Sequence, residues 1–372
     1  MNTAPTLRLC YGALHVVMQS GYRRLGHTLQ RPGDPAAIEH LLDWPATMRL
    51  RRLLDDCGLG VAEAMDTAQR FRLGWPAARR LIAECGALQL QNGFCAGAGT
   101  DQLPAVRSVV DLVDAVVEQC SYIAGHGGIP VLLPMPWLCE QDAGEQAFVD
   151  VYRAIVQQVR GPVFVHWLGA MFLPALRGYF PGHSFDRVMD LDPSKVRGCK
   201  LSLLDAAFEK RVRRRLLANG QIVLTGDDYH FGELIAGDGE PIGSVRIGAR
   251  EVSIGDFSHA LLGILDAIAR PMQRALGLLA AGDRAGFLAA MAPCEALGQH
   301  VFAAPTQHYK AGLAFLAWLN GQQQDFLLVD GEERERDAEH YRRCAELARA
   351  AGCVGDEATF AARLSAWRDG AV

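Results

Sequence analysis

Short runs of apolar residues alternate with stretches of helical periodicity along most of the chain. Continuous apolar strands separated by helices are typical of a parallel sheet that is buried on both faces. Eight such runs occur, at residues 7–17, 61–65, 88–96, 129–133, 163–167, 196–201, 221–225 and 257–263. Eight strand–helix units predict a TIM (β/α)₈ barrel. A doubly wound sheet is the alternative, but no G-x-G-x-x-G follows an early strand, so the barrel is favoured.

Beyond residue 268 the pattern predicts helices only. They are expected at residues 271–281, 284–302, 310–320, 334–351 and 357–368. We therefore divide the chain into a barrel at 1–268 and a C-terminal helical extension at 269–372, which we expect to pack on the barrel.

The segment 239–255 interrupts the rhythm of strands and helices. Its sequence, GEPIGSVRIGAREVSIG, alternates β-branched and polar residues between glycines, which predicts a hairpin inserted after the seventh strand. Because the hairpin is expected to emerge from a loop that follows a strand, it is either a surface excursion or a lid over the active-site face.

Composition narrows the class of protein. The chain has 42 acidic and 37 basic residues, a net charge of −5 and no basic stripe, which argues against nucleic acid as a partner. No apolar stretch approaches the ~20 residues that a membrane helix needs, and the first residues lack the pattern of a secretory signal. The ten cysteines are scattered without a C-x-x-C pair, which predicts free thiols in a reducing cytoplasm and no structural zinc site.

Polar residues gather at the predicted carboxyl ends of the strands, where barrel enzymes place their active sites. These residues are Glu63, Asp66, Thr100, Asp101, His166, Lys200, Asp227, Asp228, Ser258 and His259. Titratable groups at so many strand ends indicate an enzyme rather than an inert or merely ligand-binding barrel.

Among these strand-end residues, Lys200 is the most informative about the reaction. It lies within an apolar strand between Cys199 and Leu201, where burial disfavours the ammonium form and lowers the pKa. A neutral amine can condense with a ketone or aldehyde to a Schiff base. The alternative from the strand position alone is a lysine paired with Asp205, Asp227 or Asp228.

The sequence around Lys200 resembles a known enzyme family. RGCKLSLLD is similar to the G-[IV]-K segment that carries the Schiff-base lysine in dihydrodipicolinate synthases and N-acetylneuraminate lyases. IVLTGDDYHFGELIAGDG resembles their seventh-strand segment. VAEAMDTAQR, GAGTDQL, VHWLGAMF, SHALLGILDAIA and APTQHYKAGLAFLAWLNG together resemble an uncharacterised bacterial family grouped with dihydrodipicolinate synthase.

This resemblance implies a TIM barrel with Lys200 as the Schiff-base residue of a class I lyase, aldolase or dehydratase. The family's G-T-T-G-E loop corresponds here to residues 63–67, where Thr67 supplies the comparable hydroxyl, and His166 stands in place of the usual proton-relay tyrosine. Acidic groups in that loop would repel a carboxylate. We therefore expect a hydroxylated keto acid or a keto-sugar derivative, whose hydroxyls Glu63, Asp66 and Asp101 would bind.

The remaining roles follow from residue chemistry. We expect His166 and Asp228 to transfer protons, and Asp227 and His259 to contact substrate, although one of the two adjacent aspartates is expected to bind loop amides. Lys310 could reach the barrel mouth, whereas the charged run 332–337 is expected to be an exposed helix start.

The last predictions concern cofactors, binding partners and assembly. We predict no cofactor, a small carbonyl compound as the binding partner and a possible homo-oligomer. In the alternative function, Glu63, Asp66, His166, Asp227 and His259 would hold a divalent metal, as in a metal-dependent sugar isomerase or aldolase.

Overall fold

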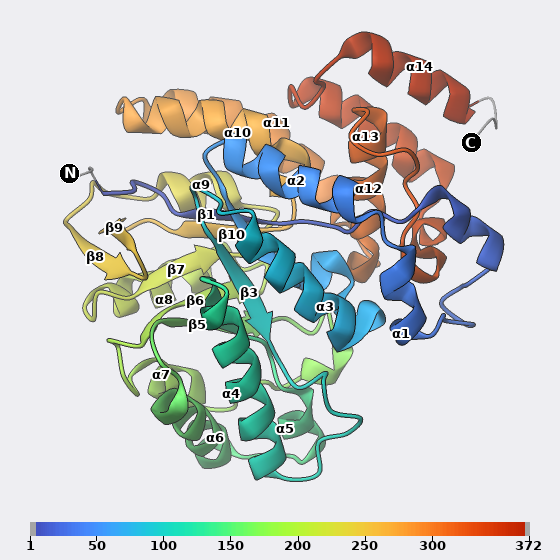
Figure 1. The fold of residues 1–372 in the computed structure, drawn as a ribbon. Helices are drawn as coiled ribbons and strands as arrows, with labels where there is room; N and C mark the ends of the chain where they lie inside the picture. Colours follow the sequence, from blue (N-terminus) through green and yellow to red (C-terminus); the bar gives the residue numbers. More distant parts are fainter. Residues whose placement is uncertain (1–4, 369–372) are drawn as a thin grey trace.

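The computed structural model describes residues 5–368 and contains the predicted closed barrel of eight parallel strands (Figure 1). The strand order around the barrel is β1-β10-β7-β6-β5-β4-β3-β2. The barrel strands are β1 (Cys10–Ala13), β2 (Gly60–Glu63), β3 (Phe94–Ala98), β4 (Ile129–Leu132), β5 (Val163–Leu168), β6 (Val196–Ser202), β7 (Ile222–Thr225) and β10 (His259–Leu262). All eight lie within, or overlap, the apolar runs from which they were predicted.

The α-helices surround the barrel and form the C-terminal extension (Figure 1). Their bounds are α1 (Pro35–Ile38), α2 (Trp44–Asp56), α3 (Arg70–Ala87), α4 (Val109–Gly125), α5 (Pro136–Glu140), α6 (Glu145–Gln158), α7 (Ser184–Met189), α8 (Ala206–Leu217), α9 (Phe231–Ala236), α10 (Leu265–Ala280), α11 (Arg284–Val301), α12 (Lys310–Leu319), α13 (Ala338–Ala350) and α14 (Glu357–Arg368). Six short 3₁₀ helices join them: η1 (Ser20–Leu25), η2 (Glu39–Leu41), η3 (Asp66–Ala68), η4 (Pro174–Leu176), η5 (Thr306–His308) and η6 (Val329–Glu335). No helix in the described part of the chain is long and apolar enough to cross a bilayer.

Alternation along each strand separates the barrel interior from the layer between the strands and the helices. On β6, Cys199 and Leu201 belong to the outer layer, so that Lys200, between them, faces inward. On β2, Ala62 faces the interior core, and Val61 faces the helices. This parity decides which of the polar strand-end residues can reach a common site.

The segment 239–255 does form a hairpin, of β8 (Gly243–Ile247) and β9 (Arg250–Ile254), but the lid hypothesis is wrong. Ile247 and Val252 pack in the barrel interior with Leu9 and Leu261, and the Arg250 guanidinium binds the carbonyl of Gln91, just before β3 begins. The hairpin therefore closes the amino-terminal end of the barrel (left in Figure 1). The reason is that α9 precedes it: the hairpin lies in a loop that leads into a strand, and such loops lie opposite the active-site end.

The C-terminal helices pack against the barrel and against one another. Helix α10 follows β10 and packs on α11, which in turn contacts α13. Our division at residue 268 falls within α10, at the kink where Ile268 departs from helical dihedrals. The run 332–337 is not an exposed helix start: Glu332 is buried in η6, and α13 begins only at Ala338, capped by Asp337.

Candidate active site

A cavity of about 530 Å³ opens at the carboxyl ends of the barrel strands. Its lining comes from the loops after β2, β3 and β4, from the ends of β5 and β6, and from the turns after β7 and β10. Six predicted site residues line it, namely Asp66, Thr67, Asp101, His166, Lys200 and Asp228. Glu63, Asp227 and His259 do not, and their positions are corrected below.

Lys200 lies on β6 at the floor of this cavity and is only partly exposed. Its side chain passes Gly226, where a Cβ atom would lie 2.8 Å from the Leu201 carbonyl oxygen and closer still to Ser202 Oγ, so this position requires glycine. Among residues 5–368, nothing forms a hydrogen bond or an ion pair within 4.0 Å of the Lys200 amine. Burial lowers its pKa, although the negative charges of Asp228 and Asp66 act in the opposite direction. The geometry thus provides a lysine that is not held in a salt bridge.

Asp228 is the carboxyl group that faces Lys200 across the cavity. Its Oδ1 accepts a hydrogen bond of 2.9 Å from the backbone N–H of Ile264. Burial raises the pKa of Asp228 to about 7, even though this hydrogen bond and the charge of Lys200 favour the ionised form. A carboxyl group with such a pKa can give and accept a proton near neutral pH.

Asp227 has a structural role instead of the substrate contact that we predicted. Its Oδ1 accepts hydrogen bonds from the backbone N–H groups of Tyr229 and His230, at 2.9 and 3.1 Å, and its Oδ2 lies 3.0 Å from the His230 ring. It fixes the turn that holds Asp228 in the cavity. One of the two adjacent aspartates was expected to do this, and Asp227 is the one.

His166 lies beside Lys200, because their Cα positions pair in the register of β5 and β6. Its Nε2 is 3.2 Å from Ser202 Oγ, and its Nδ1 is buried without a hydrogen-bond partner in the described chain. Burial and the neighbouring Lys200 hold the pKa of His166 well below its usual value, so the ring is neutral. A neutral imidazole with a free nitrogen can exchange a hydrogen bond with a bound molecule.

A tyrosine from the C-terminal extension completes the site, and sequence reasoning missed it. The hydroxyl of Tyr309 lies 2.7 Å from that of Thr67, and burial raises the Tyr309 pKa. The Tyr309 ring stacks on Phe302 at 4.3 Å, above Gly263, where a Cβ would lie 2.8 Å from the Phe302 ring. Tyr309 belongs to the motif APTQHYK, but nothing in the local sequence indicates that the start of α12 lies at the barrel mouth.

Two acidic residues of the site, Asp66 and Asp101, are already paired with cations. Asp66 binds the buried amine of Lys310 at 2.9 Å, which confirms that Lys310 can reach the barrel mouth. The Asp101 oxygens bind the Arg70 guanidinium at 2.8 and 3.1 Å. The cation beside each of these two carboxylates reduces the repulsion that we expected toward a substrate carboxylate, although Lys310 also lies 3.7 Å from Glu332.

Glu63 and His259 are elsewhere, and the prediction that they bind substrate is wrong. Glu63 is fully buried on the outer side of β2, and its two oxygens bind the Arg51 guanidinium of α2 at 2.8 and 2.9 Å. His259 begins β10 at the hairpin end, where it accepts a 2.8 Å hydrogen bond from the Leu9 N–H and lies 3.1 Å from the Ser253 carbonyl. Glu63 lies outside the cavity because alternation along β2 directs its side chain toward the helices. His259 lies outside it because the residue stands at the start of β10, at the opposite end of the barrel.

The five residues proposed as ligands of a divalent metal do not lie together. Asp66 and His166 line the cavity, whereas Glu63, Asp227 and His259 do not. Within residues 5–368, the group of three potential ligands whose atoms come within 4.8 Å of one another is His300, His340 and Cys344, on α11 and α13. All ten cysteines are free, as predicted, and most are buried.

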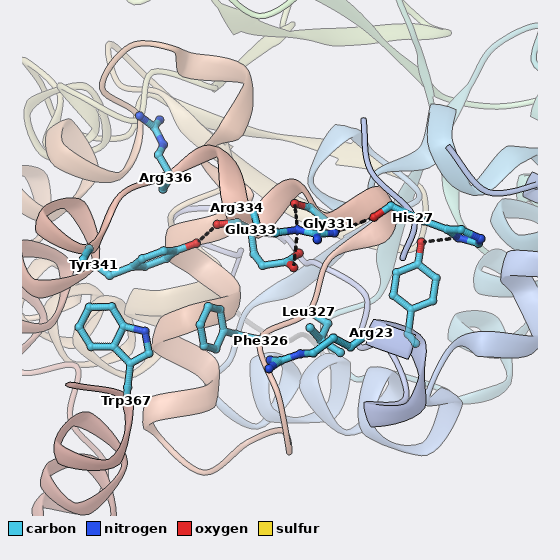
Figure 2. A pocket seen from close by; sticks show the side chains of 12 residues that line it. Arg23, His27, Phe326, Leu327, Gly331, Glu333, Arg334, Arg336, Tyr341 and Trp367 are labelled. Atoms are coloured by element: carbon cyan, nitrogen blue, oxygen red, sulfur yellow. Dashed lines mark hydrogen bonds and ion pairs between the residues drawn. The ribbon is translucent and has the colours of Figure 1, made fainter. Parts of the chain in front are cut away.

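A second cavity, of about 440 Å³, lies between η1 and the C-terminal helices (Figure 2). It is lined by arginines such as Arg23 and Arg334 and by aromatic side chains such as Tyr341 and Trp367. No lysine, and none of the predicted site residues, lines it. The candidate active site is therefore the cavity at the barrel mouth.

Solved structures share this fold over most of the chain. A putative dihydrodipicolinate synthetase from Pseudomonas aeruginosa matches with a TM-score of 0.62 and 14% identity, over 93% of this chain and 99% of that one. Dihydrodipicolinate synthase from Oceanobacillus iheyensis gives 0.62 and 14%, over 92% and 95%. N-acetylneuraminate lyase from Fusobacterium nucleatum, complexed with pyruvate, gives 0.64 and 11%, over 92% and 97%. At these identities the likeness shows the fold alone.

No curated protein sequence matches the chain. A family described as "Protein of unknown function (DUF993)" matches residues 1–369. The expected relation to an uncharacterised family with the fold of dihydrodipicolinate synthase is thereby confirmed. The chain belongs to the DUF993 family.

Proposed function

We propose that this protein is a Schiff-base-forming lyase, an aldolase or dehydratase, that acts on a small hydroxylated carbonyl compound. The observation that carries the proposal is the Lys200 amine: it faces the cavity, its pKa is lowered by burial, and no ion pair occupies it within the described chain. A lysine under these conditions is a nucleophile at neutral pH.

The neighbouring groups suit the steps of imine chemistry. The amine of Lys200 adds to the substrate carbonyl, and the carbinolamine then loses its hydroxyl as water, for which Asp228 in its protonated form supplies the proton. His166 lies beside the amine and can hydrogen-bond the departing oxygen. The resulting iminium accepts the electron pair of a bond one carbon away, so that this bond becomes breakable.

Retro-aldol cleavage of the bond between the α- and β-carbons requires removal of the proton from the substrate's β-hydroxyl. The linked hydroxyls of Thr67 and Tyr309 would relay that proton to the carboxylate of Asp66, which interacts with the Tyr309 hydroxyl. We assign this role to the pair because both side chains line the cavity and their hydroxyls lie 2.7 Å apart. Dehydration would use the same iminium: loss of a proton from the α-carbon gives an enamine, whose electron pair then expels the β-hydroxyl, and this hydroxyl gains a proton and leaves as water.

The test uses 4-hydroxy-2-oxopentanoate, a minimal β-hydroxy carbonyl compound, with borohydride. We expect reduction to attach the carbon skeleton to the peptide that contains Lys200, as read by mass spectrometry. Lys200→Arg should abolish trapping and turnover together, because a guanidinium stays protonated and cannot attack a carbonyl. Lys210→Arg is the matched control, since Lys210 lies on the surface of α8 and pairs with Glu233.

A second arm of this test addresses the metal-dependent alternative. The wild-type protein should retain turnover in EDTA if Lys200 carries the reaction. Turnover without a trapped adduct on Lys200, or turnover that EDTA abolishes, contradicts the proposal.

A further inference from the structure

The cavity at the barrel mouth has a polar floor and an apolar wall. Lys200, His166, Asp228 and Ser202 gather at the floor. The wall is built mainly from large apolar side chains of the surrounding loops, among them Phe71, Trp137, Leu168, Phe172, Leu173 and Phe302. A molecule whose carbonyl group reaches Lys200 would therefore place the rest of its length against apolar surface.

Apart from Thr100 and Glu140 near the rim, and beyond the contact of the Thr67–Tyr309 pair with the β-hydroxyl, the polar side chains of the wall are already engaged. Asp66 is paired with Lys310 and Asp101 with Arg70, and the Thr67 and Tyr309 hydroxyls bind each other. A hydroxyl that is buried without a partner lowers affinity by roughly tenfold or more. A polyhydroxylated chain would meet this penalty at several positions along the wall.

The mouth itself exposes apolar surface. Phe71, on the first turn of α3, is 58% exposed, although large aromatic side chains are usually covered. It lines the same cavity as the buried ring of Phe302, so the apolar wall continues from the interior to the rim. Such continuity suits a ligand with an apolar end that extends outward from the floor.

We propose that the substrate carries an aliphatic or aromatic substituent beyond its β-hydroxyl, and is not a sugar chain. This inference rests on the proposed function, because the orientation of the substrate follows from attack by Lys200. It retains the hydroxylated keto acid expected from the sequence and selects against the keto-sugar derivative. Affinity would come from burial of the substituent, and positioning from the polar floor.

Two probes with matched skeletons test the inference. 2-Keto-3-deoxygluconate and 4-hydroxy-5-methyl-2-oxoheptanoate share the same reacting end, and the second replaces the two terminal hydroxyls with methyl groups. Borohydride trapping on Lys200 is measured against probe concentration for each. We expect half-saturation at a concentration at least about tenfold lower for the methyl compound, from apolar burial and from the absence of unpaired hydroxyls.

Phe71→Ser should reduce that preference, and the protein should remain folded because the side chain is already exposed. Ile242→Ser is the matched control: Ile242 is 71% exposed, and it directly precedes the hairpin at the other end of the barrel. The control should leave the preference of the wild type unchanged.

The outcomes distinguish this inference from the proposed function. Equal or tighter half-saturation by the sugar acid, with trapping on Lys200, overturns the inference and leaves the Schiff-base lyase standing. Trapping of neither probe, nor of 4-hydroxy-2-oxopentanoate, overturns both. A preference for the methyl compound that Phe71→Ser does not alter also contradicts the inference, because the wall would then not be its source.

Discussion

A substitution of Glu63 distinguishes two roles for this residue. Glu63 was predicted to bind substrate, but it forms a buried ion pair with Arg51. We predict that Glu63→Gln destabilises the protein strongly and leaves the chemistry of Lys200 intact. Both side chains are fully buried, and Glu63 also accepts a 2.8 Å hydrogen bond from the Ala64 N–H.

The magnitude follows from the charge that is left behind. Glutamine keeps one acceptor for the guanidinium but turns an amide N–H₂ toward it, so that Arg51 stays charged in a fully buried site without its paired carboxylate. Breaking a buried pair in this way costs about 3–5 kcal/mol. For comparison, the pair of Arg349 with Glu357 lies on the surface, and Glu357→Gln should cost at most about 1 kcal/mol.

The assay is urea unfolding followed by tryptophan fluorescence, together with borohydride trapping under native conditions. Glu63→Gln should lower the free energy of unfolding by several times the effect of Glu357→Gln, while trapping per folded molecule stays at the wild-type level. A Glu63→Gln protein with wild-type stability but no trapping would refute the structural role and return Glu63 to the substrate site.

Three further predictions address other parts of the fold. Tyr309→Phe should lower turnover by about 10²–10⁴-fold and leave borohydride trapping on Lys200 in place, because the hydroxyl serves proton transfer and not imine formation; equal loss of both would contradict this. The pKa of His259 is lowered by burial to about 3, so the unfolded chain takes up the proton first as the pH falls below ~6.5. Between pH 7 and pH 5 the wild type should therefore lose about 2 kcal/mol of stability that His259→Asn does not lose, as measured by urea unfolding at each pH. Val252→Ala, which opens space in the interior under the hairpin, should cost about 2 kcal/mol with turnover unchanged, whereas a lid would show the reverse.

The sequence alone predicted the elements of this protein and the inward position of Lys200. Apolar runs of strand length, separated by helices, are sufficient to predict a parallel barrel, because both faces of each strand must be buried. The apolar neighbours of Lys200 were informative for the same reason: alternation along β6 sends Cys199 and Leu201 outward and therefore sends Lys200 inward.

Only the tertiary structure decided which polar residues share the site with Lys200. Glu63 has the same apolar neighbourhood as a cavity residue, but strand parity directs it toward Arg51, and the start of each strand is not visible in the sequence to within one residue. The location of the hairpin depended on α9, a helix too short to be recognised by its periodicity, which carries the chain to the other end of the barrel. Tyr309 and Lys310 come from a segment more than 240 residues from Thr67 and Asp66, with which they pair. Contacts over such separations leave no local pattern, because they arise from packing of whole helices and not from the order of neighbouring residues.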